Sequence, residues 1–194
     1  MPIEIRDGKG TGNRTRVGGN RLFAHTIAEG EEVHASEQGD SYNINTGNIG
    51  LTSQSESAIL YFKNNEDRDF IIDAIALGVD SSGTTGNDSI VTLMRNPTAA
   101  SFSTAVDMNQ NRNFGSSKTL TADVFKGAEA ATLTGGNAIA QFYMDAGSRL
   151  FAGIDFVLTK GDAIGVKIDT DTTSGTTNVY AALIGHLKDT NFVD

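Results

Sequence analysis

The chain has 194 residues, a formal net charge of −9 at pH 7 and no cysteine. This length suits one β-sandwich domain, and a domain of this size buries roughly 70% of its unfolded surface without disulfides. The absence of cysteine excludes disulfides and thiolate metal sites. The acidic balance argues against general nucleic-acid binding, which needs a basic footprint. No apolar run approaches the ~20 residues of a membrane span, so we expect neither nucleic acid nor a membrane as partner.

The first 20 residues differ from the rest in composition and charge. Residues 1–21 hold five basic and two acidic residues, so +5 − 2 = +3, and the remaining chain carries −12. This glycine-rich segment has few large apolar residues and cannot bury enough area to order itself. Two interpretations stay open, a disordered terminus and a basic arm that binds an acidic partner surface. The arm's candidate contact residues are Arg6, Lys9, Arg14, Arg16 and Arg21. The segment also lacks the apolar region of a secretory signal, which predicts synthesis in the cytoplasm or export without a signal.

Residues 21–194 are predicted to form one all-β domain of about eight to ten antiparallel strands. Alternating or continuous apolar runs, separated by turn-forming residues, predict strands at 21–29, 49–52, 89–95, 138–144, 149–158, 163–168 and 179–187, and a pair within 57–79. Both strands of the pair carry apolar residues on both faces, so we expect the pair at the middle of one packed layer. The regular spacing favours a single jelly-roll-like β-sandwich with an extended N-terminal arm.

The remaining segments are predicted to be turns, loops or surface crossings. They are a turn at 30–32, a weakly patterned surface crossing at 33–44, loops at 80–88 and 169–177, and a long excursion with little strand at 99–129. Residues 119–125 are expected to form either a short strand or a helical turn, and one short helix is predicted near Ala122–Ala131.

The sequence offers no constellation for catalysis or metal binding. His25, His34 and His186 lie far apart, and none has a second histidine or a carboxylate at metal-ligand spacing, so we expect no metal and no other cofactor. Residues 169–171, Asp-Thr-Asp, superficially resemble a calcium loop but lack the closing glutamate and the ligand spacing of an EF-hand. Acidic pairs could imitate a glycosidase dyad, but the chain has no tryptophan to stack on a sugar. We therefore expect that the protein is not an enzyme.

A charged cluster joins the two strands of the central pair. Its members are Glu66, Asp67, Arg68 and Asp69. One interpretation is a local ion-pair cluster that braces the connection between the strands. The other is a subunit contact in which Arg68 forms a bidentate pair across the interface.

Several strings resemble a family of virion structural proteins of tailed bacteriophages, many of them marine. They are YNINTG (42–47), YFKNNEDRDFII (61–72), RNPTA (95–99), NRNFGSSKTLTADVFKGAE (111–129) and KGDAIGVKID (160–169), and they occur in the family's order. The resemblance spans about residues 21–187 and is structural, not chemical. It implies a jelly-roll-like sandwich on the virion, most often a capsid decoration (cement) protein that forms trimers. It implies no catalytic residues.

The expected function is therefore that of a capsid decoration protein, assembled in the host cytoplasm and located on the capsid surface. Three copies are expected to form a homotrimer through sheet faces and the 99–129 excursion, where Asn111, Arg112 and Phe114 are the candidate contacts. The basic arms are expected to bind the major capsid protein, so that several weak contacts become one strong attachment. A tail- or fibre-associated jelly roll that binds a host-surface glycan is the alternative, and a carbohydrate-active enzyme is a third hypothesis.

Overall fold

The structure is a computed structural model that describes residues 4–6, 14–18, 21–23, 30–53, 55–80, 84–85, 88–99, 104–105 and 109–189. Side chains are described within 30–53, 55–80, 88–98 and 110–189. The chain divides into two compact units, Met1–Gly30 and Glu31–Asp194. Lys9 and His25 lie outside the described residues.

The N-terminal unit contains a small sheet that the sequence did not predict. β1 (Glu4–Arg6), β2 (Arg14–Gly18) and β3 (Arg21–Phe23) pair antiparallel in the order β1-β2-β3. The division after residue 30, instead of residue 20, assigns β3 to this unit and not to the sandwich.

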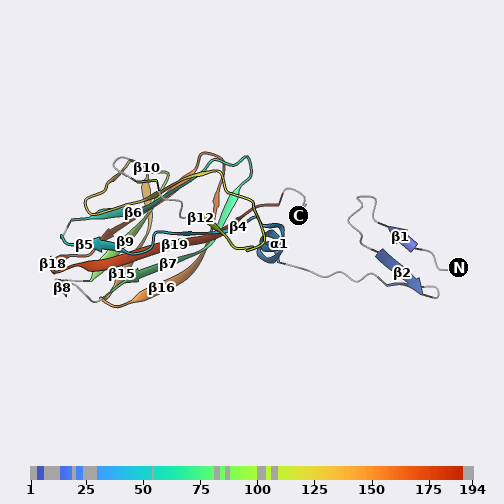
Figure 1. The fold of residues 1–194 in the computed structure, drawn as a ribbon, viewed down its shortest axis with the longest axis horizontal. Helices are drawn as coiled ribbons and strands as arrows, with labels where there is room; N and C mark the ends of the chain where they lie inside the picture. Colours follow the sequence, from blue (N-terminus) through green and yellow to red (C-terminus); the bar gives the residue numbers. More distant parts are fainter. Residues whose placement is uncertain are drawn as a thin grey trace. The chain divides into compact units, whose positions relative to one another are not determined.

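The second unit, the body, is a β-sandwich of two antiparallel sheets, which confirms the predicted all-β class (Figure 1). One sheet has the order β11 (Thr104–Ala105), β13 (Ala122–Lys126), β6 (Ser57–Asn64), β17 (Ala163–Asp169), β9 (Ser89–Arg95) and β15 (Asn137–Met144). The other has the order β12 (Asn109–Asn111), β4 (Ser41–Asn45), β19 (Thr177–Leu187), β7 (Phe70–Val79) and β16 (Arg149–Leu158), and β5 (Ile49–Leu51) also pairs with β19. Two short pairs, β10 (Thr98–Ala99) with β14 (Leu133–Thr134) and β8 (Thr84–Thr85) with β18 (Thr172–Ser174), lie outside these sheets.

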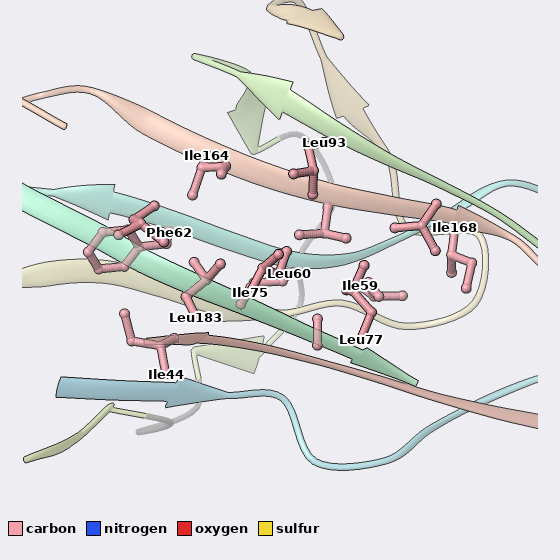
Figure 2. Close-up of a cluster of buried hydrophobic side chains, with 14 of the residues drawn as sticks. Ile44, Ile59, Leu60, Phe62, Ile75, Leu77, Leu93, Ile164, Ile168 and Leu183 are labelled. Carbon is pink, nitrogen blue, oxygen red and sulfur yellow. The ribbon is translucent and has the colours of Figure 1, made fainter. Parts of the chain in front are cut away.

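The core lies between the β6 and β7 sheets and consists mostly of aliphatic side chains of both (Figure 2), together with the aromatic rings of Tyr42, Phe62 and Phe70. A smaller cluster on the outer face of the β6 sheet joins Ala58, Tyr61 and Met94 to Ala131 and Leu133. Because side chains on both faces of β6 are covered, this strand is apolar on both faces, as central strands are.

The prediction that the two strands of the 57–79 pair share one layer is wrong. β6 and β7 both exist, but each is an internal strand of a different sheet. The polar connection between them crosses the end of the sandwich, where Asn64 Nδ2 donates to the carbonyls of Arg68 and Leu158 at 2.9 Å each. This anchoring turns the chain from one sheet into the other.

The prediction of a turn at 30–32 and a surface crossing at 33–44 is also wrong, because α1 (Glu31–Gln38) and β4 occupy this segment. Two acidic residues in the first turn of α1 suit the helix dipole. Gly39, at φ +75°, closes the helix: its N–H donates to Ser36 O at 3.1 Å, and Asp40 N–H donates to Ala35 O at 2.7 Å. Ala35 is the buried residue of this helix. Because the helix buries so little apolar surface, its sequence lacks the apolar periodicity that would have predicted a helix.

The helix predicted near Ala122–Ala131 is wrong as well. Residues Ala122–Lys126 form β13, which pairs with β6 from Ala122 opposite Asn64 to Lys126 opposite Leu60. Pairing with a long internal strand overrides the local preference of the segment.

The other predicted strands of the body are confirmed. β5, β9, β15, β16, β17 and β19 each begin and end within two residues of the predicted ranges. Together the two sheets hold 6 + 6 = 12 described strands, more than the eight to ten expected. The additional strands include β4, β11 and β12, which are short and have no apolar pattern that predicts a strand. Within the described part of the chain, no helix has the length and apolarity needed to cross a membrane.

Candidate interaction surface

A polar network at the α1 end of the body connects four segments that lie far apart in sequence. Arg68 Nη1 donates to Asp40 Oδ2 at 2.9 Å, Nε donates to Lys188 O at 2.9 Å, and Nη2 donates to Leu187 O at 3.0 Å. Lys118 Nζ lies 2.9 Å from the other oxygen of Asp40. Burial raises the pKa of Asp40, but the hydrogen bonds and charges of Lys118 and Arg68 outweigh burial and hold the pKa below its usual value.

The bracing interpretation of the 66–69 cluster is thus confirmed for Arg68, whose donors bind within the chain. Glu66 Oε1 accepts the Thr121 N–H at 2.6 Å, and Asp67 pairs with Lys160 at the surface. The backbone carbonyl of Asp69 accepts the Lys188 N–H at 2.8 Å. A subunit contact by these residues remains a prediction.

Asn111 is the last residue of β12, and the candidates Arg112 and Phe114 lie in the turn that follows it. Asn111 Nδ2 donates to Gly39 O at 2.7 Å, and Arg112 Nη1 donates to Glu32 Oε1 at 2.7 Å, so the turn is fixed to α1 and its C-terminal end. Figure 1 shows β12, β4 and α1 together at one end of the body. Phe114 itself is fully exposed.

The last strand of the β6 sheet, β15, and the last strand of the β7 sheet, β16, have no further strand beside them among the described residues. We call this side of the body the open flank. Large apolar side chains point to solvent on both strands, and these are Ile139, Tyr143, Phe151 and Val157. Residues that face the core from the same strands are also only half-buried, and these include Phe142, Ile154 and Phe156. Such an apolar edge is typical of a surface that another molecule covers.

Each strand of the open flank is interrupted by a bulge. The pairing of β15 with β9 shifts between Ala138 and Ala140, and the pairing of β16 with β7 shifts between Gly153 and Phe156. Asp155 has φ +45° at the second bulge. Because bulges disturb the regular row of backbone donors and acceptors, this flank is suited to side-chain packing more than to the addition of another strand.

A pocket of about 430 Å³ lies where the two bulges approach each other. Its apolar wall consists of Ile139, Phe156, Val157, Leu158, Ala163 and Ile164, and its polar wall of Arg95, Asn96, Asp155 and Asp162. Hydrogen bonds from Thr159 and Asn96, together with nearby Arg95, outweigh burial and keep the pKa of Asp162 low. The pocket is therefore lined by both apolar and charged residues.

The described histidines lie apart from this pocket. His186, near the end of β19, is buried, and its Nδ1 lies 3.0 Å from the carboxylate of Asp73. His34 Nε2 lies 3.4 Å from Asp189 Oδ2. No group of three or more potential metal-ligating side chains is found among the residues that the structure describes.

The Asp-Thr-Asp segment at 169–171 forms a turn stabilised by its own side chains. Asp169 Oδ1 accepts the Asp171 N–H at 3.1 Å. The hydroxyls of Thr170, Thr172 and Thr177 form a buried chain with distances of 2.7 and 3.0 Å. The segment is therefore a hydrogen-bonded corner between β17 and β18.

The basic candidates of the N-terminal unit come together through backbone pairing. The register places Arg6 opposite Arg14, Arg16 opposite both Glu4 and Phe23, and Arg21 opposite Gly18. Cross-strand partners share a face, as do alternate residues of one strand. The positions of Arg6, Arg14, Arg16 and Arg21 therefore fall on one face of the small sheet, which we call the basic face.

No protein-family model and no curated protein matches this chain. The resemblance to virion structural proteins is therefore still a prediction. The surfaces above are argued from their own residues.

Sequence reasoning named the Phe114 turn and the arginines but missed the open flank and its pocket. The strands of the flank were predicted, yet their position at the edges depends on pairings with β9 and β7, which lie far away in sequence. The one local signal was the presence of apolar residues on both faces of two strands that carry few charges.

Proposed function

We propose that the protein is a virion decoration protein that binds the exterior of a phage head and bridges neighbouring copies of the major capsid protein. The basic face of the N-terminal unit is the attachment surface, and the β-sandwich body is a rigid block that associates with other copies. The observation that carries the proposal is the gathering of four arginine positions on one face of a small sheet, in a unit separate from the acidic body.

The pairing within the small sheet supports an acidic partner for this face. Arg6 and Arg14 are direct cross-strand neighbours, and like charges in this position destabilise a sheet. A carboxylate-rich surface placed against the face would relieve this repulsion and form bidentate hydrogen bonds with the guanidinium groups. An attachment that is weak for one copy becomes strong when several copies of the associated body bind at once.

Reversal of charge on the basic face tests the attachment. The variant Arg14→Glu/Arg16→Glu should lose most of its occupancy on purified heads that lack the protein. The matched control Lys160→Glu/Lys188→Glu makes the same charge change at two exposed positions of the body and should bind as the native chain does. Binding of the native chain should also weaken with salt, since exposed charges are screened. Equal loss in both variants, or none in either, would contradict the proposal.

One observation favours the alternative of a tail-associated glycan binder. A second pocket, of about 320 Å³, is lined by Asn48, Asp80, Arg149, Asn178 and Tyr180 among others, which combines hydrogen-bonding groups with an aromatic ring. However, the Tyr180 ring packs directly over Gly78, where an added Cβ would lie 2.0 Å from the ring, so one ring face is already covered. Gold labelling of whole virions separates the two functions: label over the head supports decoration, and label confined to the tail supports the alternative.

A further inference from the structure

Phe114 is a fully exposed aromatic side chain on a turn that is held in place. Asn111 Oδ1 accepts the Asn113 N–H at 2.8 Å, and Asn113 Oδ1 accepts the Gly115 N–H at 3.0 Å. Asn113 Nδ2 also donates to Glu37 O of α1 at 2.9 Å. An aromatic ring displayed on a preorganised turn loses little conformational entropy on binding, which is the property of an interface anchor.

The pocket of the open flank is suited to such a ring. Its volume of about 430 Å³ exceeds the needs of one phenyl group, and its lining includes apolar residues such as Phe156 and Ile164. Ile139 and Val157 are exposed at the pocket and would be covered by an inserted side chain.

The turn and the pocket lie at the same height on opposite edges of the β7 sheet. One continuous row of paired residues crosses the sheet from Asn111 to Tyr42, Gly185, Ile72 and finally Phe156. Asn111 lies three positions before Phe114, and Phe156 lines the pocket. Two copies placed side by side, without a shift along the strands, therefore bring the turn of one to the pocket of the next.

The charges around the Phe114 turn and around the open-flank pocket are compatible with a second copy of the chain as the occupant of the pocket. The body is strongly acidic, so most of its surfaces repel another copy. On the turn side, Arg112 pairs with Glu32 and Lys118 pairs with Asp40. On the pocket side, Arg95 offsets part of the charge of the two carboxylates that line the pocket. Contact between the turn of one copy and the pocket of another therefore brings together little uncompensated negative charge.

We propose that Phe114 of one copy inserts into the open-flank pocket of a second copy. The contact is heterologous, because the turn and the pocket are different surfaces of the chain. Their positions on opposite edges of one sheet prevent two copies from making both contacts with each other at once. The contact therefore repeats from copy to copy until a ring closes, and the predicted homotrimer is the smallest such ring.

The inference rests on the proposed function only in that decoration requires associated copies, and it is tested in solution without capsids. The mass of the full-length native chain, measured by light scattering after gel filtration, should be a multiple of the monomer. Phe114→Ala and Val157→Glu should each shift the mass to that of a monomer, with at least about a thirtyfold loss of affinity, as expected for an aromatic anchor. Asp88→Ala changes an exposed position outside both the open-flank strands and the Phe114 turn and should keep the native mass.

Mixing the two monomeric variants identifies the heterologous contact. Phe114→Ala retains an intact pocket and Val157→Glu retains an intact Phe114, so the mixture should form a dimer that cannot grow further.

A native chain that stays monomeric at tens of micromolar, an assembled Phe114→Ala variant, or no dimer in the mixture would each overturn the inference. Assembly that depends on Arg14 and Arg16 but not on Phe114 would show that the N-terminal unit, and not Phe114, makes the contact between copies. That result would also overturn the inference. Loss of head binding by the charge-reversed variant with native mass would leave this contact intact, so the two proposals fail separately.

Discussion

The ring of Phe62 in β6 packs against the ring of Phe70 in β7, with centroids 4.9 Å apart and an angle of 51° between the ring planes. The two residues lie close in sequence but belong to opposite sheets, so their contact joins the two layers at the end where the chain crosses between them. Tilted aromatic pairs of this kind contribute about 0.5–1.5 kcal/mol beyond the burial of their area.

Truncation of either ring should therefore destabilise the body strongly. Both rings are fully buried, so Phe62→Ala and Phe70→Ala should each lower the free energy of unfolding by about 3–5 kcal/mol. The double variant should lose about 0.5–1.5 kcal/mol less free energy of unfolding than the sum of the two single variants, because the contact between the rings can be lost only once. Urea unfolding of the four proteins measures this coupling. The exposed Phe151→Ala is the control, and strict additivity at the buried pair would refute the contact.

Arg68 should stabilise the α1 end of the body through its three intrachain acceptors. Arg68→Leu leaves the largely buried carboxylate of Asp40 with Lys118 alone and leaves two carbonyls at the end of β19 without this donor. The expected loss is about 2 kcal/mol in the free energy of unfolding. Arg68→Lys should recover only part of it, because an ammonium cannot reach three acceptors in the geometry of a guanidinium. An exposed arginine on β16 provides the control: Arg149→Leu should leave the urea midpoint nearly unchanged.

The same carboxylate should make the body sensitive to acid. The pKa of Asp40 is lower in the folded than in the unfolded chain. Its stabilising contribution is therefore complete above the unfolded value of about 3.9, and it is lost as the pH falls through the folded value. Asp40→Asn should be less stable than the native chain at pH 6, and this difference should shrink at pH 3. Parallel pH profiles for the two proteins would show that Asp40 is not the responsible group.

Tyr42 should titrate late. Burial, assisted by the charges of Asp40 and Glu66, raises its pKa to about 12. A raised folded pKa means that the contribution of the neutral phenol is complete below the unfolded value of about 10 and is lost as the pH rises through about 12. In a pH titration followed by tyrosinate absorbance, Tyr42→Phe should therefore lack the step at the highest pH that the native chain shows. If the variant instead loses a step near pH 10, the phenol is accessible to water in solution.

Gly39 should be required for the end of α1. Its φ of +75° disfavours other residues, and an added Cβ would lie 2.2 Å from Ser116 Oγ. Gly39→Ala should cost at least about 1 kcal/mol in the free energy of unfolding. Gly30→Ala meets no atom within 4 Å and should be nearly neutral. Equal stability of the two variants would contradict the helix closure described here.

Much of the fold could be predicted because most strands carry their signal locally. β9 and β16 were placed at their observed bounds from apolar runs and turn residues alone. α1 was missed although its signals were present, two acidic residues at the start and a glycine after the last turn, because it buries little apolar surface. For β13 the sequence left a strand at 119–125 and a helix near 122–131 as alternatives, because the pairing with β6 that selects the strand cannot be recognised in the segment's own residues.

The sequence by itself determined the all-β class, the bounds of the long strands, and the separation of positive from negative charge. These properties follow from the order of side chains along a short stretch. Only the tertiary structure decided that β6 and β7 face each other, that β15 and β16 end their sheets, and that a pocket opens between the two bulges at the height of Phe114. Those properties depend on pairing between strands distant in the chain, which is selected by the packing of the whole core and not by any one segment.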